Sequence, residues 1–176
     1  MRKGFTLIEL MIVIAIIAVI AAIAIPNLMR NKMEANHTAA AASCRQILSA
    51  QSTFHKGDYD GNLIYDYCAD YSDLYYTQKA GQPIKLIDKA LADADDDGGA
   101  GIPKSGYLFG DLTTDAAGNA YDNRYECAIC AWPALYNRSG LYTYVIDITG
   151  SVYMSDLGAG APLTQYPDTA TWLLVH

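Results

Sequence analysis

The chain has 176 residues, of which 52% are apolar, and its formal net charge is −7. This length suits one ordinary domain and leaves little room for a second. The sequence pI of about 4.7 argues against a nucleic-acid-binding protein, which would show a basic face or stripe, so we expect no nucleic acid as the primary ligand.

Apolar residues and charges are unevenly distributed along the chain. Of the 21 residues from Phe5 to Ile25, 19 are apolar. The first 33 residues carry a net charge of +3, whereas the remaining 143 carry 8 basic and 18 acidic side chains, a net charge of −10. A basic, apolar segment is therefore joined to an acidic, polar one, which argues against a purely soluble cytosolic enzyme.

The segment Phe5–Ile25 is long enough to cross a membrane as a helix, because about 20 apolar residues span the roughly 30 Å hydrocarbon core. It is longer than the apolar part of a secretory signal peptide, and no A-x-A site in it is followed by a polar mature start. A plain membrane anchor explains the length but not Glu9, since a carboxylate in such a helix costs about 2.5–3.5 kcal/mol on insertion scales. We expect no partner for Glu9 nearby on the apolar helix of its own chain.

The first ten residues, MRKGFTLIEL, resemble the class III signal peptide of type IV pilins and type II secretion pseudopilins, with its prepilin-type N-terminal methylation motif. The resemblance implies that a prepilin peptidase cuts after Gly4 and methylates the new amino terminus at Phe5. It makes Glu9 the fifth mature residue, which in the family pairs with the free amino group of a neighbouring subunit. Pro26 falls where the family places a helix-distorting proline, so Glu9 and Pro26 are the predicted assembly residues.

A long helix should follow the leader peptide of residues 1–4. From Phe5 to Lys56 there is no glycine and one proline, and these 52 residues would form about 78 Å of helix. We expect a kink or a short unwound stretch around Ala22–Pro26, because proline removes a backbone hydrogen bond and clashes with the preceding turn. Residues 5–28 should be the membrane and filament-core half, and residues 29–57 an amphipathic half packed on the head.

Residues 58–176 should form the globular head. Residues 58–105 are expected to be a helical and loop connection, with short helices over Tyr71–Ala80 and Pro83–Asp95. Residues 106–156 should form an antiparallel sheet with strands at Gly106–Leu112, Tyr125–Trp132, Leu141–Ile148 and Ser151–Asp156. Thr149-Gly150 predicts a hairpin between the last two strands, and residues 157–176 should be a C-terminal loop whose end returns to pack. The expected fold class is α+β and pilin-like, with the long helix packed on the sheet.

Two acidic segments have the spacing of a calcium loop. Their candidate ligands are Asp58, Asp60, Asn62 and Asp66 in the first, and Asp93, Asp95 and Asp97 in the second. Neither has the glutamate that completes such a loop at its twelfth position. Two interpretations therefore stay open, calcium binding or surface turns. We expect no required cofactor, with calcium as the candidate ligand.

Four cysteines, an even number in an exported domain, favour two structural disulfides with three pairings open. They are Cys44, Cys68, Cys127 and Cys130. Asn36 and Asn137 begin Asn-x-Ser/Thr sequences and are candidate glycosylation sites. No Ser/His/Asp or Cys/His set has sequence support, so we expect no catalytic residue and no enzymatic activity.

The resemblance predicts a structural subunit of a helical filament, either an extracellular type IV pilus or a periplasmic pseudopilus, that polymerises with itself. Its precursor would sit in the inner membrane, with Arg2 and Lys3 on the cytoplasmic side, before assembly into a cell-surface or periplasmic fibre. By family analogy its other partners are the prepilin peptidase, an assembly ATPase and an inner-membrane platform protein. The alternatives are a minor or initiating pseudopilin of a type II secretion system and a membrane-anchored acidic protein that binds calcium or a partner.

Overall fold

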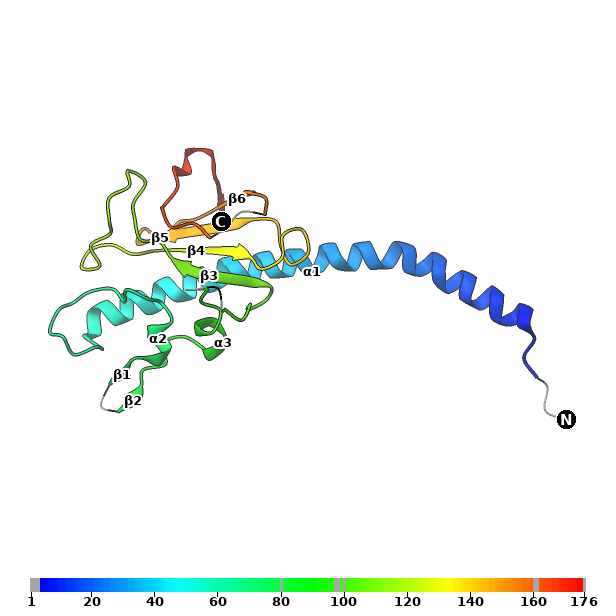
Figure 1. Cartoon of the computed structure of the whole chain (residues 1–176), viewed down its shortest axis with the longest axis horizontal. Coiled ribbons are helices and arrows are strands. Elements are labelled where there is room, and N and C mark those ends of the chain that lie inside the picture. The colour runs from blue at the N-terminus through cyan, green and yellow to red at the C-terminus, as the bar shows by residue number, and fades with distance from the viewer. Residues whose placement is uncertain (1–3, 80, 97–98, 100, 160–161, 176) are drawn as a thin grey trace.

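A long helix and a head form the molecule. The structure is a computed structural model, and it describes residues 4–79, 81–96, 99, 101–159 and 162–175. Helix α1 (Leu7–Gly57) contains 51 residues, and its N-terminal half projects from the head (Figure 1). It begins at the N-cap Thr6 and ends where Asp58 takes a left-handed backbone conformation, with φ 41°.

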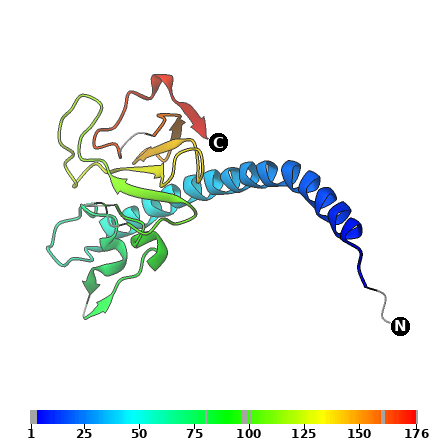
Figure 2. The ribbon, with the colours of Figure 1, turned by 45° about the vertical axis from the view of Figure 1, so that its right-hand side comes forward.

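Pro26 lies inside α1 without interrupting it. The helix continues through Ala22–Pro26, so the predicted unwound stretch is absent. The N-terminal half instead bends away from the axis of the rest (Figure 2). One lost hydrogen bond is tolerated here because the hydrogen bonds of the adjacent turns are kept.

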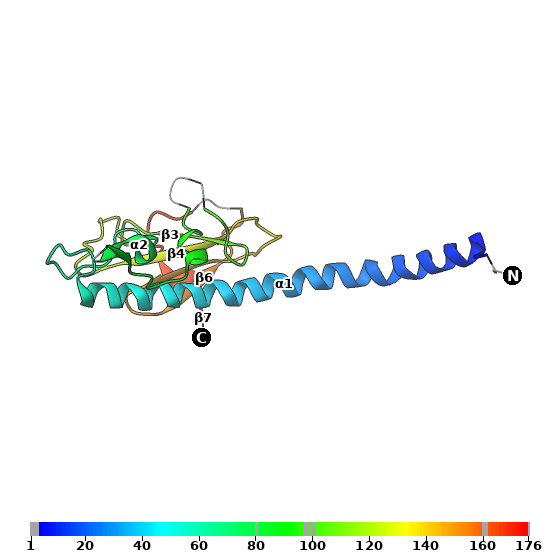
Figure 3. The same cartoon turned by 90° about the horizontal axis from the view of Figure 1, so that it is seen from below.

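Contact between α1 and the head begins late in the helix. None of the described residues before Asn36 is buried, whereas ten residues from Asn36 to Phe54 are. The buried positions recur every three or four residues, as the predicted amphipathic half requires. Figure 3 shows this part of α1 running along the sheet while the rest extends beyond it.

The head contains a five-stranded antiparallel meander in which each strand pairs with the next. Its strands are β3 (Tyr107–Asp111), β4 (Ala128–Pro133), β5 (Thr143–Asp147), β6 (Val152–Ser155) and β7 (Leu173–Val175). The four predicted strands and the β5–β6 hairpin are confirmed, although β4 begins three residues later than expected. The C-terminal segment is more than the predicted loop, because β7 pairs with β6 and forms one edge of the sheet.

The connection between α1 and the sheet is less helical than the sequence predicts. It contains the four-residue helices α2 (Asp73–Tyr76) and α3 (Lys89–Ala92). Between them, β1 (Gln78–Lys79) pairs with β2 (Gln82–Pro83). The prediction of longer helices is wrong. α2 ends at Tyr76, where Thr77 becomes extended with ψ 138°, and α3 begins only at Lys89, where the Asp88 side chain caps it.

Both faces of the sheet are covered, which explains why β4 is almost continuously apolar. Its Ile129 and Ala131 join the main core with α1, while Cys130 and Trp132 join a second cluster on the opposite face. The C-terminal segment covers that second cluster with side chains that include Trp172.

Candidate assembly site

The N-terminus of α1 is closed by a reciprocal pair of hydrogen bonds between Thr6 and Glu9. The Thr6 hydroxyl accepts a bond of 3.3 Å from the Glu9 backbone N–H. The Glu9 carboxylate accepts bonds from the Thr6 backbone N–H, at 2.9 Å, and from the Thr6 hydroxyl, at 2.7 Å. The expectation that Glu9 lacks a partner within its own chain is therefore wrong.

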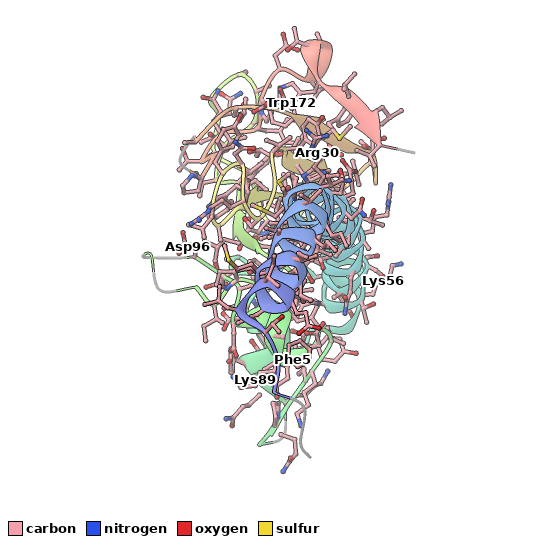
Figure 4. The ribbon with its side chains drawn as sticks, turned by 90° about the vertical axis from the view of Figure 1, so that its right-hand side faces the viewer. Phe5, Arg30, Lys56, Lys89, Asp96 and Trp172 are labelled. Atoms are coloured by element: carbon pink, nitrogen blue, oxygen red, sulfur yellow. The ribbon has the colours of Figure 1, made fainter. Side chains whose placement is uncertain are left out.

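This arrangement places the only acidic side chain of the apolar segment beside the predicted cleavage point. Phe5 directly precedes Thr6, whose N–H already bonds to Glu9, so a new amino terminus at Phe5 would begin next to this carboxylate. Figure 4 looks along α1 from this end and shows Phe5 well separated from the head residue Trp172. Cleavage would thus create a positive charge at the same helix end that carries the negative one.

The N-terminal half of α1 presents a continuous apolar surface. Large apolar side chains from Phe5, 82% exposed, to Met29, 44% exposed, have no cover in the single chain. α1 is long and apolar enough to cross a membrane. A surface of this extent requires lipid or other protein around it.

The first predicted calcium segment forms turns by bonding to itself. The Asn62 amide donates to Asp60 at 2.6 Å and to Asp66 at 3.4 Å. Asp58 accepts a bond from the Leu63 backbone N–H at 3.2 Å. The interpretation of these side chains as turn formers accounts for these bonds.

Two of the predicted ligands in the second segment have different partners. Asp93 forms an ion pair with Lys89 at 2.6 Å and accepts a hydrogen bond from Tyr76. Asp95 lies in a different cluster, and Asp97 is outside the described residues. Calcium binding by this segment stays a prediction, although Asp93 already has two partners.

Three carboxylates that the sequence does not link lie together instead. One oxygen each from Asp70, Asp95 and Asp111 lies within 4.8 Å of the others. They line a cavity of about 350 Å³ whose other walls include Trp132 and Leu163. Burial opposes ionisation of Asp70, but hydrogen bonds with Asp95 and with Ser72 hold its pKa below the usual value.

Sequence spacing could not reveal this cluster, because its members come from three separate places. Asp70 precedes α2, Asp95 follows α3 and Asp111 ends β3. A bridge between Asp95 and Phe109 of β3 brings the second place to the sheet, and Asp111 accepts a 2.8 Å bond from the Tyr71 N–H beside Asp70. The only local signal was the aspartate content of the segment around Asp95.

All four cysteines are buried and unbonded in the structure, so the two predicted disulfides are not shown. Cys44 and Cys68 lie in the main core, while Cys130 belongs to the cluster on the other face of the sheet. Burial raises the pKa of Cys44 and of Cys127 to about 12. Thiols in such surroundings stay protonated and are poor nucleophiles.

The two candidate glycosylation sequences have different surroundings. Asn36 is buried within α1, and its amide donates a 2.7 Å hydrogen bond to the Ser139 carbonyl. The prediction of a glycan there is wrong, because that nitrogen is enclosed and already bonded. Asn137 is exposed, so glycosylation there stays a prediction.

Comparison with known proteins decides the family. A family model described as the prokaryotic N-terminal methylation motif matches residues 1–25. The chain is 46% identical over 53 residues to the type IV major pilin protein PilA of Myxococcus xanthus, which is 30% of this chain and 24% of the relative. It is 50% identical over 52 residues to the type IV wide pilus major component PilA4 of Thermus thermophilus, which is 30% of this chain and 40% of the relative. The N-terminal third of the chain is therefore similar to type IV pilins.

The remaining matches extend this result to secretion systems and to the head. The chain is 39% identical over 61 residues to the type II secretion system core protein G of Pectobacterium carotovorum, which is 35% of this chain and 37% of the relative. It therefore spans between about a quarter and two fifths of the length of these relatives. A model described as "Protein of unknown function (DUF2950)" matches residues 22–166, which is most of the chain. The chain belongs to that family. No solved structure matches the chain.

Proposed function

We propose that the protein is a structural subunit of a helical filament of the type IV pilus class. The observation that carries the proposal is the uncovered apolar half of α1, with Glu9 bonded at its very start. The named relatives are two major pilins and a secretion-system core protein, and their similarity is confined to 52–61 residues. The proposal transfers the role of those proteins to this chain.

Before assembly, the apolar half of α1 lies in the inner membrane. Arg2 and Lys3 hold the start of the chain on the cytoplasmic side, and a prepilin peptidase removes residues 1–4 and methylates Phe5. Within lipid, the bonds from Thr6 lower the cost of the Glu9 carboxylate by supplying hydrogen-bond donors.

In the filament, the same apolar surfaces of many subunits pack against one another. When the apolar half of α1 moves from lipid into the fibre, little hydrophobic free energy is gained, because both surroundings are apolar. Specific contacts must therefore stabilise the fibre, and the pair between Glu9 and the amino terminus of a neighbouring Phe5 is the strongest candidate. An assembly ATPase and a membrane platform protein supply the work of extraction.

The test is reconstitution of the fibre. The full chain would be produced together with a prepilin peptidase, an assembly ATPase and a platform protein in a host without its own pilin. Electron microscopy is expected to show fibres for the wild-type chain and none for Gly4→Val, whose uncut precursor stays in the membrane. A processed wild-type chain that remains wholly in the membrane fraction would contradict the proposal.

A secretion pseudopilus is the second candidate, and the similarity to core protein G supports it. A main pilus component should form long surface fibres at its natural abundance, with this chain as the principal subunit. A pseudopilus subunit, or a minor or initiating one, should instead be required for release of secreted proteins while forming no long surface fibre. Deleting the gene and measuring secreted protein and surface fibres in the same cells separates the two.

We also propose that the acidic head takes up calcium, at Asp70, Asp95 and Asp111 rather than in either predicted loop. Three carboxylate oxygens within 4.8 Å supply the hard ligands that calcium prefers, beside a cavity that leaves room for water ligands. Calcium should raise the melting temperature of the wild-type protein relative to chelator, and Asp111→Asn should reduce that rise. The control Asp115→Asn should leave it unchanged, and identical melting of the wild type with calcium and with chelator would refute the site.

A further inference from the structure

The loop Asp58–Asp66 presents an apolar tip framed by acidic residues. It follows the end of α1, at the end of the molecule opposite the N-terminus (Figure 1). Leu63 is 87% exposed and Tyr65 is 64% exposed, and Ile64 between them is also exposed. Asp58, Asp60 and Asp66 are its charged residues.

Hydrogen bonds within the loop and contacts at its base hold this tip in place. The bonds from Asn62 to Asp60 and Asp66 order its middle. At its base, Tyr59 stacks on Phe54 of α1, and the Lys79 ammonium lies 4.5 Å from the Tyr59 ring centroid. A loop that is already ordered loses less conformational entropy when its apolar side chains bind a partner.

A groove of complementary character lies just before this loop, along α1. Arg45, Ser49, Ser52 and Lys56 follow one another at spacings of four, three and four residues, which places them on one face of the helix. They line one side of a cavity of about 560 Å³, and the other side includes Tyr67, Ile146 and Ile148. The groove therefore combines two basic side chains with an apolar wall.

The charge of this groove is available to a partner. The Lys56 ammonium makes no ion pair with any residue that the structure describes, and its side chain is exposed. The Arg45 guanidinium donates one 3.0 Å bond to the Val175 carbonyl, which neutralises none of its charge. In Figure 4, Lys56 and the acidic Asp96 lie on opposite flanks of the molecule.

A filament that does not close requires two different surfaces on each subunit, so that each copy offers one and receives the other. The loop is acidic and apolar, whereas the groove is basic and apolar. The two surfaces are therefore different and complementary in charge. From Arg45 to Lys56 the groove covers about 16 Å of α1, so a neighbour shifted along the fibre by about that length brings its loop beside the groove.

We propose that the loop Asp58–Asp66 of one subunit docks in the Arg45–Lys56 groove of the next. Leu63 enters between Ser49 and the exposed Ile148, and Tyr65 contacts the same apolar wall, while the loop carboxylates face the two basic side chains. This inference rests on the proposed filament, and it adds a head-to-head contact to the packing of the apolar helices.

Cross-linking between two single-cysteine variants tests the contact directly. Leu63→Cys and Ser49→Cys chains would be produced in the same cell, so that any bond between the new thiols must join two molecules. The native cysteines are buried, so mild oxidation of purified fibres should link the new thiols alone. A mixed dimer is expected from this pair, and neither variant alone should give one. Leu63→Cys with the exposed Ala117→Cys, as control, should also give none.

The outcomes separate the contact from the filament itself. Wild-type fibres whose Leu63→Cys and Ser49→Cys subunits assemble together without a mixed dimer would overturn the docking and leave the proposed function standing. Absence of wild-type fibres would overturn the proposed function. A dimer with Ala117→Cys as abundant as that with Ser49→Cys would also refute the contact, because it would show unspecific collision.

A charge variant provides a second measurement that does not depend on the new cysteines. Lys56→Glu should lower the fibre yield about tenfold, the effect of roughly 1.4 kcal/mol at the contact. Lys85→Glu makes the same charge change at an exposed position outside the groove and should leave the yield within about twofold of the wild type. Equal yields for both variants would count against the groove as the docking surface.

Discussion

Glu9 has a hydrogen-bonded position before any neighbouring subunit arrives. Its carboxylate accepts bonds from the backbone and the side chain of Thr6, at the first turn of α1. An acidic side chain is also favoured at a helix N-terminus by the helix dipole. In the proposed filament, assembly would replace or add to this existing set of bonds, and the new partner must offer more than a hydroxyl. A charged amino terminus on a neighbour does.

Removing this carboxylate should abolish assembly but not insertion. Glu9→Ala keeps the length and the apolar character of the segment, so the variant should still enter the membrane and be processed at Gly4. It should yield no fibres, because the paired charge in the fibre core is lost. Glu34→Ala removes an exposed acidic group from the same helix and serves as the control. Fibre yields from Glu9→Ala that equal those of the control would refute this role, and electron microscopy with membrane fractionation measures both.

His37 connects α1 to the sheet through a neutral imidazole. Its Nε2 accepts a 3.1 Å bond from the Leu141 backbone N–H, so a proton on that nitrogen would remove the acceptor. Burial lowers the pKa of His37, and the nearby Glu34 only partly offsets this. The folded head thus disfavours protonation of His37 relative to the unfolded chain.

The head should consequently lose stability as the pH falls below about 6.5, the unperturbed histidine value. A lowered pKa of His37 in the folded state means that the unfolded chain binds more protons below about pH 6.5. The neutral His37 therefore stabilises the head fully above that pH, and this stabilisation is lost as the pH falls below it. Denaturant unfolding of the full chain in detergent, from pH 7.5 to pH 5, measures the trend. His37→Gln should flatten it, and an unchanged slope in that variant would exclude His37 as the cause.

The elements that follow local patterns could be predicted from the sequence. The absence of glycine from Phe5 to Lys56 indicates the long helix, and the alternation of side chains indicates β5. Residues that can form a strand are also concentrated in β3, β4 and β6. These features depend on nearest neighbours in the chain, and the structure confirms them.

The elements that depend on distant contacts could not be predicted. β7 is a strand because β6 offers it an edge, since its own three residues have no distinguishing pattern. Gln78 and Lys79 leave the predicted helix Tyr71–Ala80 because they pair as β1 with β2. Asp70, Asp95 and Asp111 meet only when β3 aligns beside the segment after α3, so spacing alone suggested the wrong acidic partners for Asp95.

The C-terminal segment should stabilise the head mainly through Trp172, which packs on the outer face of the sheet. Trp172→Ala removes apolar contact with the second cluster, to which Cys130 and Val145 belong, and should lower the free energy of unfolding by about 1–3 kcal/mol. Leu173→Ala, at a side chain that is 61% exposed, should cost less than about 0.5 kcal/mol. Equal losses for the two variants, measured by denaturant unfolding, would mean that the segment does not cover the sheet as described.

Over the whole molecule, apolar surface and charge are separated along one long axis. The uncovered apolar half of α1 extends from one end of the chain, and the acidic head forms the other (Figure 3). Removal of residues 1–4 takes away Arg2 and Lys3 and changes the formal net charge from −7 to −9. A fibre built on the apolar half would therefore have an acidic coat, whose repulsion the basic groove on α1 partly offsets.

The N-terminal peptide of the subunit in purified surface fibres tests the central claim most directly. Fibres would be sheared from cells that produce the full chain, and the peptide would be identified by mass spectrometry. The account predicts that the fibre subunit is this chain, beginning at a methylated Phe5. Fibres that lack the chain, while it remains in the membrane with Met1–Gly4 still attached, would contradict it.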